Sequence, residues 1–178
     1  MGDSADRSFD TRGFRQALGR FPTGVCVVTS TAVGHRLGMT LSSFNSLSLD
    51  PPLVLFSIDR AAVSLHLWAL AEGYAINVLS ENQKDLSNRF ARSLSNKWEG
   101  INYALGAFEA PILPGAAAVF ECAAWARYDG GDHTLFVAEV LRFRISPDRR
   151  PLVFGMGRYA SLQTTEYSAP LWPLDIHY

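Results

Sequence analysis

The residues best suited to chemistry in this 178-residue chain are small and hydroxylated side chains within residues 34–58. Thr40, Ser42 and Ser43 lie close together in this segment. Ser and Thr hydroxyls, together with backbone N–H groups, can hold a phosphate without a metal ion. In an extended strand, Thr40 and Ser42 would share one face, and Leu41 and Ser43 the other. The segment therefore predicts either one wall of a ligand site or a polar strand whose hydroxyls bond within the protein.

Two arginine-containing segments could supply positive charge to such a site. Arg60 precedes a predicted helix and Ser64 lies in its first turn, where both could meet an anion at the positive helix end. Arg89 and Arg92 flank Phe90 and could offer a second cation and an aromatic face. The alternatives are solvated arginines and an ordinary exposed helical face. The residues alone favour a small-molecule pocket for a phosphate or a nucleotide.

Familiar catalytic motifs are absent from the sequence. The four histidines lie far apart, and none belongs to an H-E-x-x-H motif, so we expect no metal site. There is no G-x-S-x-G elbow, no P-loop and no G-x-G-x-x-G after a strand, which disfavours a serine hydrolase and the usual nucleotide-binding folds. His133 follows an Asp-Gly-Gly turn, where by itself it is typical of a surface histidine at a strand start.

The composition limits which binding partners and which cellular compartment we expect. The net charge is −1 and no basic run resembles a nucleic-acid footprint, so we expect no nucleic-acid partner. No apolar run reaches the roughly 18 residues of a membrane span, and the N-terminus lacks a secretory apolar region. Cys26 and Cys122 lie in apolar strand-like runs, which indicates free buried thiols and a cytoplasmic protein without a membrane partner.

Hydrophobic periodicity predicts two or three short helices. The first covers residues 14–21, has Asp10 or Thr11 as a possible N-cap, and is expected to pack on the core. The second presents one apolar face, made of Val63, Leu67 and Leu70. The third follows an S-x-x-Q capping box at Ser80 and Gln83 and runs to Ala91.

Strand-like runs occupy most of the remaining chain. A turn at residues 33–35 and an Asp-Gly-Gly turn before His133 predict two hairpins, and Pro51-Pro52 separates two further strands. Residues 93–115 are polar and predict a long excursion with a turn of helix at most. The expected strands are residues 25–31, 53–58, 74–79, 116–128, 133–145 and 152–156, together with the segment after residue 35. Mostly antiparallel strands in this number tend to close into a barrel, so we expect a mainly β protein with peripheral helices.

Five stretches then carry a resemblance to a known family: FRQALGRFPTGVCVVTS, GMTLSSFNSLSLDPPLVLFSI, YAINVLSENQKDLSNRFA, GGDHTLFVAEV and PLVFGMGRYASL. In this order and spacing the chain resembles the flavin reductases that form the reductase component of two-component monooxygenases. The resemblance covers residues 9–162. It implies an antiparallel FMN-binding split barrel, usually a homodimer. The polar N-terminus predicts a flexible segment at residues 1–8. The tail at residues 163–178 lies outside the motifs, and its aromatic residues predict packing on the domain or on the dimer mate.

The resemblance also implies an activity and a site. NADH or NADPH would reduce FMN or FAD, and the reduced flavin would diffuse to a partner monooxygenase. His133 would orient the nicotinamide, and Tyr159 could line the same face. Phe90 and the residues just after it would close over a phosphate or an adenine. The remaining implied cofactor-binding residues are Arg36, Leu37, Gly38, Met39, Thr40, Ser42 and Ser43 along the flavin, with Ile58, Asp59, Arg60, Ser64 and Leu65 at its ribityl and phosphate end.

Three other functions compete with a reductase. The first is a flavin-binding carrier or sensor on the same barrel without catalysis. The second is an oxidase of the pyridoxamine-phosphate type, which the GGDH and SSFNS segments disfavour. The third is a barrel for an apolar ligand, which the hydroxyls of Thr40, Ser42 and Ser43 disfavour.

Overall fold

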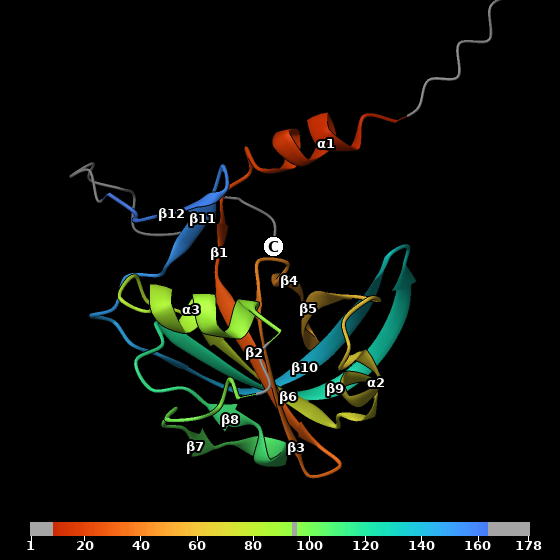
Figure 1. Ribbon diagram of the computed structural model, residues 1–178. Coiled ribbons are helices and arrows are strands. Elements are labelled where there is room, and N and C mark those ends of the chain that lie inside the picture. Colours follow the sequence, from red (N-terminus) through yellow and green to blue (C-terminus); the bar gives the residue numbers. More distant parts are fainter. Residues whose placement is uncertain (1–8, 94–95, 164–178) are drawn as a thin grey trace, which may run out of the picture.

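The computed structural model describes residues 9–93 and 96–163 (Figure 1). The expectations for residues 1–8 and for the tail beyond residue 163 lie outside the described residues. No helix among those described is both long enough and apolar enough to cross a membrane. The same residues contain no group of three or more His, Cys, Asp or Glu side chains placed to hold a metal ion.

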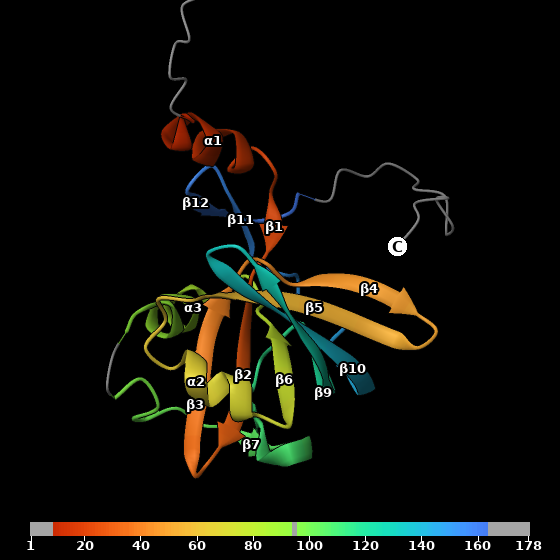
Figure 2. The ribbon, with the colours of Figure 1, turned by 90° about the vertical axis from the view of Figure 1, so that its right-hand side faces the viewer.

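The main sheet has seven strands in the order β3-β2-β6-β9-β10-β5-β4, and every neighbouring pair is antiparallel. Figure 2 shows the sheet curving from β3, β2 and β6 towards the β4–β5 pair. This arrangement confirms the predicted mainly β, antiparallel fold. The strands are β2 (Cys26–Ala32), β3 (His35–Leu41), β4 (Asn45–Leu49), β5 (Pro52–Asp59), β6 (Gly73–Val78), β9 (Ala118–Gly130) and β10 (His133–Ile145).

Smaller elements surround this sheet. A three-stranded sheet holds β1 (Thr23–Gly24), β11 (Val153–Gly155) and β12 (Arg158–Ala160), and a two-stranded one holds β7 (Ala104–Leu105) and β8 (Pro111–Ile112). The helices are α1 (Thr11–Leu18), α2 (Leu65–Leu70), α3 (Lys84–Ala91) and a 3-10 turn at Ala107–Glu109. The sequence patterns missed β1, β7, β8 and β12, because strands of two or three residues are too short to show a period.

Both predicted hairpins are present. Val33 and Gly34 have φ values of 50° and 75° between β2 and β3, and Gly131 has a φ of 78° between β9 and β10. Two-residue hairpin turns need positive φ to match the twist of the strands, and glycine adopts it without strain. These local turns fix the register of the two hairpins.

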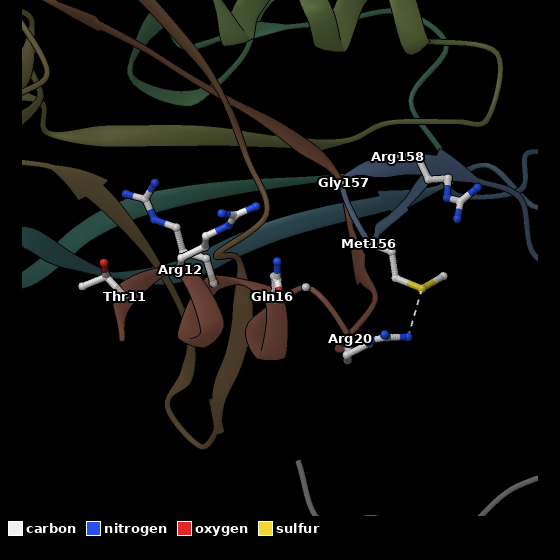
Figure 3. A pocket seen from close by; sticks show the side chains of 9 residues that line it. Thr11, Arg12, Gln16, Arg20, Met156, Gly157 and Arg158 are labelled. Carbon is white, nitrogen blue, oxygen red and sulfur yellow. Dashed lines mark hydrogen bonds between the residues drawn. The ribbon is translucent and has the colours of Figure 1, made fainter. Parts of the chain in front are cut away.

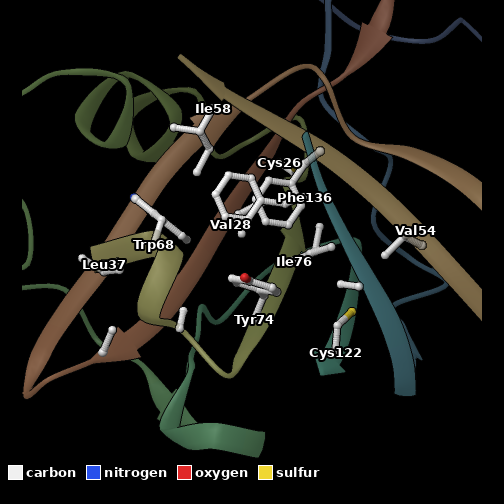
Figure 4. Close-up of a cluster of buried hydrophobic side chains, with 14 residues drawn as sticks. Cys26, Val28, Leu37, Val54, Ile58, Trp68, Tyr74, Ile76, Cys122 and Phe136 are labelled. Atoms are coloured by element: carbon white, nitrogen blue, oxygen red, sulfur yellow. The ribbon is translucent and has the colours of Figure 1, made fainter. Parts of the chain in front are cut away.

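Two hydrophobic clusters lie on opposite sides of β2. Alternate residues of a strand point to opposite faces, so Cys26 and Val28 enter one cluster while Val27 enters the other. The first cluster centres on Phe56 and Phe136, whose rings stack with their centroids 5.2 Å apart (Figure 4). The second is capped by α3, and its buried members are Val25, Val27, Leu79, Phe90, Leu113 and Leu152.

Two of the helix predictions need correction. Helix α1 forms with Asp10 as its N-cap, but it has no buried residue, and Phe14 and Leu18 are 48% and 56% exposed. The predicted packing of α1 on the core is therefore wrong. In α2 the buried residue is Trp68, whereas Val63 and Leu70 are 87% and 61% exposed. The predicted apolar face is wrong because the short helix starts only at Leu65.

The capping box before α3 forms in part. The Gln83 side chain accepts a hydrogen bond from the backbone N–H of Ser80 at 2.9 Å, as the motif requires. The Ser80 hydroxyl has no partner among the described protein atoms, and the helix begins at Lys84.

A buried carboxylate joins β9 to the loop before β8. Glu121 is 4% exposed, and its Oε2 accepts hydrogen bonds from Arg142 and from the backbone N–H of Ala107, both at 2.7 Å. The hydrogen bond from Arg142 is the main cause that holds the pKa of Glu121 below its usual value, followed by the Ala107 N–H, while burial opposes them. The ionised carboxylate therefore stabilises the folded state.

We predict that Glu121→Gln lowers the free energy of unfolding at neutral pH by about 1–3 kcal/mol, because charge-assisted hydrogen bonds are lost. Because the pKa of Glu121 is lower in the folded than in the unfolded state, its contribution to stability is complete above the unfolded pKa near 4.5. This contribution is lost as the pH falls through the folded pKa. Denaturant unfolding between pH 7 and pH 3 should show the two proteins converging in acid. Glu139→Gln on β10 is the control, and an equal, pH-independent loss in both variants would contradict this role.

Candidate functional site

A cleft of about 390 Å³ opens beside β3, between the loop that precedes α2 and the segment that follows α3. Its volume lies in the range of small-molecule sites. Arg36 and Lys97 bring two cationic side chains to the cleft, and Ser64 brings a hydroxyl. The full lining is Arg36, Leu37, Gly38, Met39, Ala62, Val63, Ser64, Ser93, Lys97 and Trp98.

Gly38 allows the wall of the cleft to pack against β3. A Cβ at this position would lie 2.5 Å from the Phe90 ring and 2.9 Å from the Trp98 ring. Those two rings pack edge to face with their centroids 4.9 Å apart, and the Trp98 indole N–H donates to the Arg36 carbonyl at 3.1 Å. A side chain at Gly38 would therefore displace Trp98, which lines the cleft.

Lys97 is held at the base of this wall. Its Nζ donates to the Gly38 carbonyl at 3.1 Å and to the Phe90 carbonyl at 3.5 Å, and burial lowers its pKa. Arg89 supports the same segment from behind, because its guanidinium donates to the carbonyls of Asn96, Lys97 and Glu99. The predicted role of Arg89 as a free cation is wrong, since it is occupied by these backbone groups.

Five of the predicted cofactor-binding residues meet in this cleft: Arg36, Leu37, Gly38, Met39 and Ser64. The Ser64 hydroxyl also accepts a hydrogen bond from the Trp68 indole at 3.2 Å, which orients it. The resemblance placed the residues just after Phe90 near a phosphate or an adenine, but Ser93, Lys97 and Trp98 were not singled out, because they lie in a polar segment without periodicity.

Two of the predicted hydroxyls are bonded within the protein. Thr40 donates to the Ser87 carbonyl of α3 at 2.7 Å. Ser43 donates to the Ser57 carbonyl at 3.2 Å and accepts from the Ser57 N–H at 3.0 Å. Thr40 and Ser43 therefore behave as in a polar strand whose hydroxyls bond within the protein, whereas Ser42 is exposed.

Of the residues predicted to hold the phosphate end of the flavin, only Ser64 lines the cleft, and the others make contacts within the protein. Ile58 is fully buried and Leu65 packs against the first hydrophobic cluster, so direct ligand contact is not supported for either. The Asp59 carboxylate accepts from the Ala61 N–H at 2.7 Å and shapes the turn. Arg60 forms an ion pair with Asp129 at 2.5 Å, which fastens this turn to the β9–β10 hairpin.

Phe90 and Tyr159 do not face the cleft. Phe90 is 1% exposed and fills the second cluster, so it supports the wall from within, and its closure over a ligand stays a prediction. The Tyr159 hydroxyl makes 2.9 Å hydrogen bonds with Ser87 and Asn88 of α3. It thus fastens β12 to that helix, and neither residue lines the cleft.

His133 begins β10 directly beside Asp59 of β5. Its Nδ1 lies 2.7 Å from Asp132 Oδ1, and its side chain is 42% exposed. The hydrogen bond from His133 is the main cause that lowers the pKa of Asp132, so this carboxylate is ionised near neutral pH. The pairing orients the imidazole and leaves Nε2 for a ligand, at the far end of the turn whose other end lines the cleft.

The described residues thus form a curved antiparallel sheet with a cleft beside its edge strand β3, and Arg36 and Lys97 line that cleft. Residues 18–163 match the model of the Flavin reductase like domain. The chain belongs to the flavin reductase family, which confirms the resemblance inferred from its motifs.

Curated relatives and solved structures agree with this assignment. The FMN reductase (NADH) SmoA of Agrobacterium fabrum is 43% identical over 150 residues, which cover 84% of this chain and 85% of SmoA. Nitrilotriacetate monooxygenase component B of Mycobacterium thermoresistibile superposes with a TM-score of 0.87 at 33% identity, over 95% of this chain and 96% of that one.

A third relative has been solved with ligands. The NADH:FAD oxidoreductase SgcE6 of Streptomyces globisporus, in complex with NAD and FAD fragments, gives a TM-score of 0.84 at 35% identity, over 89% of this chain and 96% of that one. Three other curated relatives are longer, and this chain spans between 43% and 60% of their length.

We predict that Gly38→Ala weakens flavin binding by about tenfold and lowers the free energy of unfolding by about 1–3 kcal/mol, because the added Cβ displaces Phe90 and Trp98. Quenching of flavin fluorescence and denaturant unfolding measure the two effects. Gly24→Ala is the matched control, since a Cβ there meets nothing within 4 Å. Unchanged flavin affinity in Gly38→Ala would exclude this cleft as the flavin site.

Proposed function

We propose that this protein is an NADH-dependent flavin reductase that binds its flavin, FMN or FAD, in the cleft beside β3. The cleft itself carries this proposal, because it brings two cationic side chains and a hydroxyl to a wall that includes Leu37, Met39 and Trp98. That set of donors fits a flat ring system with a phosphate-bearing tail. The names of the relatives support the same cofactors, since they are NADH-dependent FMN or FAD reductases.

The residues of the cleft bind and orient, and no nucleophile or metal is required of them. The flavin, when bound, accepts a hydride at its ring from the nicotinamide, so the protein must mainly align two rings and exclude water. Arg36 would contact the phosphate, and Trp98 would limit the ring plane. Lys97, whose Nζ bonds the Gly38 and Phe90 carbonyls, would add positive charge at the base of the wall. His133 would hold the nicotinamide through Nε2, because its Nδ1 is engaged by Asp132.

We further propose that the reduced flavin leaves the cleft and diffuses to a flavin-dependent monooxygenase. A relative solved as a monooxygenase component supports this proposal. Two buried free thiols, Cys26 and Cys122, support a reducing compartment such as the cytoplasm. The second candidate, a carrier without catalysis, would use the same cleft but would leave the ordered His133–Asp132 pair without a role.

The decisive experiment adds NADH or NADPH anaerobically to the protein with excess FMN or FAD. We expect rapid loss of the visible flavin absorbance with NADH at catalytic amounts of protein. A flavin that binds tightly and keeps its colour would favour the carrier.

His133→Ala should raise the KM for NADH by about tenfold, since a hydrogen bond to the nicotinamide is lost, while flavin affinity changes less than twofold. A larger loss of flavin affinity than of NADH affinity would overturn the role of His133.

An apolar surface on β10 supports a homodimer. Leu141, Phe143 and Ile145 are 52%, 62% and 68% exposed, and Phe143 packs against Phe120 with their centroids 6.2 Å apart. Phe120 packs in turn against Phe44 at 5.6 Å. An exposed apolar surface of this kind indicates an interface, and we propose that a second copy of the chain covers it.

We predict that Phe143→Glu converts the dimer to a monomer at micromolar concentration, because a charge is placed in a desolvated interface. Sedimentation velocity or light scattering measures the mass. Leu105→Glu on β7 is the control, as Leu105 is also 62% exposed but belongs to the separate two-stranded β7–β8 sheet. If both variants keep the mass of the parent protein, β10 does not form the interface.

A further inference from the structure

A second cleft, of about 730 Å³, lies between α1 and the turn that joins β11 to β12 (Figure 3). Four arginines line it, and none of its lining residues is acidic; we call it the arginine cleft. Its lining residues are Thr11, Arg12, Arg15, Gln16, Gly19, Arg20, Met156, Gly157 and Arg158. It shares no residue with the cleft beside β3.

Helical spacing places these residues on one face of α1. Arg12, Arg15 and Gln16 stand at positions i, i+3 and i+4, so their side chains are neighbours on the helix surface. Phe14 and Leu18 are also four positions apart and lie on another face. The helix therefore turns its basic face to the arginine cleft and a separate apolar face away from it.

The opposite wall is fixed to the helix by backbone contacts. The Met156 N–H donates to the Gly19 carbonyl at 2.7 Å, and Thr23 pairs with Phe154 between β1 and β11. Gly157 has a φ of 74° and open space where a Cβ would stand, so this turn presents bare backbone to the cleft. The arginine cleft is thus held by the fold on both sides.

The charge of the arginine cleft is unbalanced. The four ion pairs found among residues 9–93 and 96–163 involve none of its arginines. The whole chain has a net charge of −1, so this concentration of cations is local rather than a general property. Guanidinium groups bind phosphate oxygens in bidentate pairs, and a concave volume of this size suits a small molecule.

We propose that the arginine cleft binds a ligand carrying two linked phosphates, such as a nucleoside diphosphate group. Its four guanidiniums supply more than enough positive charge for the two or three negative charges of a diphosphate, and the Met156 side chain offers an apolar contact beside them. The diphosphate could belong to a free nucleotide or to the nicotinamide dinucleotide. Arg15 makes the smallest of the contributions to the lowered pKa of Asp132, well after the hydrogen bond from His133, so its charge acts only weakly on the carboxylate beside His133.

Calorimetric titration of the full-length protein with ADP tests this proposal. We expect micromolar binding that weakens steeply with salt, and an affinity about a hundredfold lower in Arg15→Gln/Arg158→Gln, at about tenfold for each lost phosphate contact. Arg144→Gln/Arg149→Gln removes the same charge from exposed positions elsewhere and should bind ADP within twofold of the parent protein. Circular dichroism and the mass in solution establish that both double variants fold and assemble alike.

Repeating the titration with saturating NAD⁺ separates the two sources of the diphosphate. Unchanged ADP binding, with an unchanged KM for NADH in Arg15→Gln/Arg158→Gln, would support a site for a free nucleotide. Competition by NAD⁺, with a raised KM for NADH but unchanged flavin affinity, would support the dinucleotide. Equal ADP affinity in the two double variants, or no binding at millimolar ADP, would overturn the proposal and leave the flavin reductase function intact.

Discussion

The burial of β2 on both faces is the constraint on which the rest of the structure depends. Val27 and Val28 are both fully buried, although they point to opposite sides of the strand. One side must then be covered by the curved sheet together with α2, and the other by α3 with its neighbouring segments. Because α3 is drawn onto β2 and β3 in this way, the chain that leaves it passes directly over Gly38 and forms the cleft.

A buried polar side chain extends this constraint to the long segment after α3. The fully buried Asn77 amide donates to the Val27 carbonyl at 3.0 Å, and its oxygen accepts from the Leu113 N–H at 2.8 Å. An unpaired amide in the core would be costly, so the segment is tied to the sheet near its end. Lys97 and Trp98 lie between this tie and α3, which explains how residues without regular secondary structure can form a fixed wall.

Sequence patterns predicted the parts of the fold that depend on neighbours along the chain. The β9–β10 hairpin, the turn before His35 and the N-cap at Asp10 follow from local residue types, and all are present. The site was predicted only in part, because the partners of its side chains are distant in the sequence. Nothing near Thr40 indicates that its hydroxyl bonds Ser87, and nothing in the polar segment around Lys97 marks it as a residue of the site.

Helix α1 shows how a sequence can predict an element correctly and still mislead about its environment. Its apolar spacing is that of a core helix, yet Phe14 and Leu18 are largely exposed and its arginines face a cleft. A helix of eight residues is marginal in isolation, so its two faces need partners outside its own hydrogen bonds. Within residues 9–93 and 96–163 its apolar face stays exposed and its basic face lines the arginine cleft, so local spacing predicts the helix but not its surroundings.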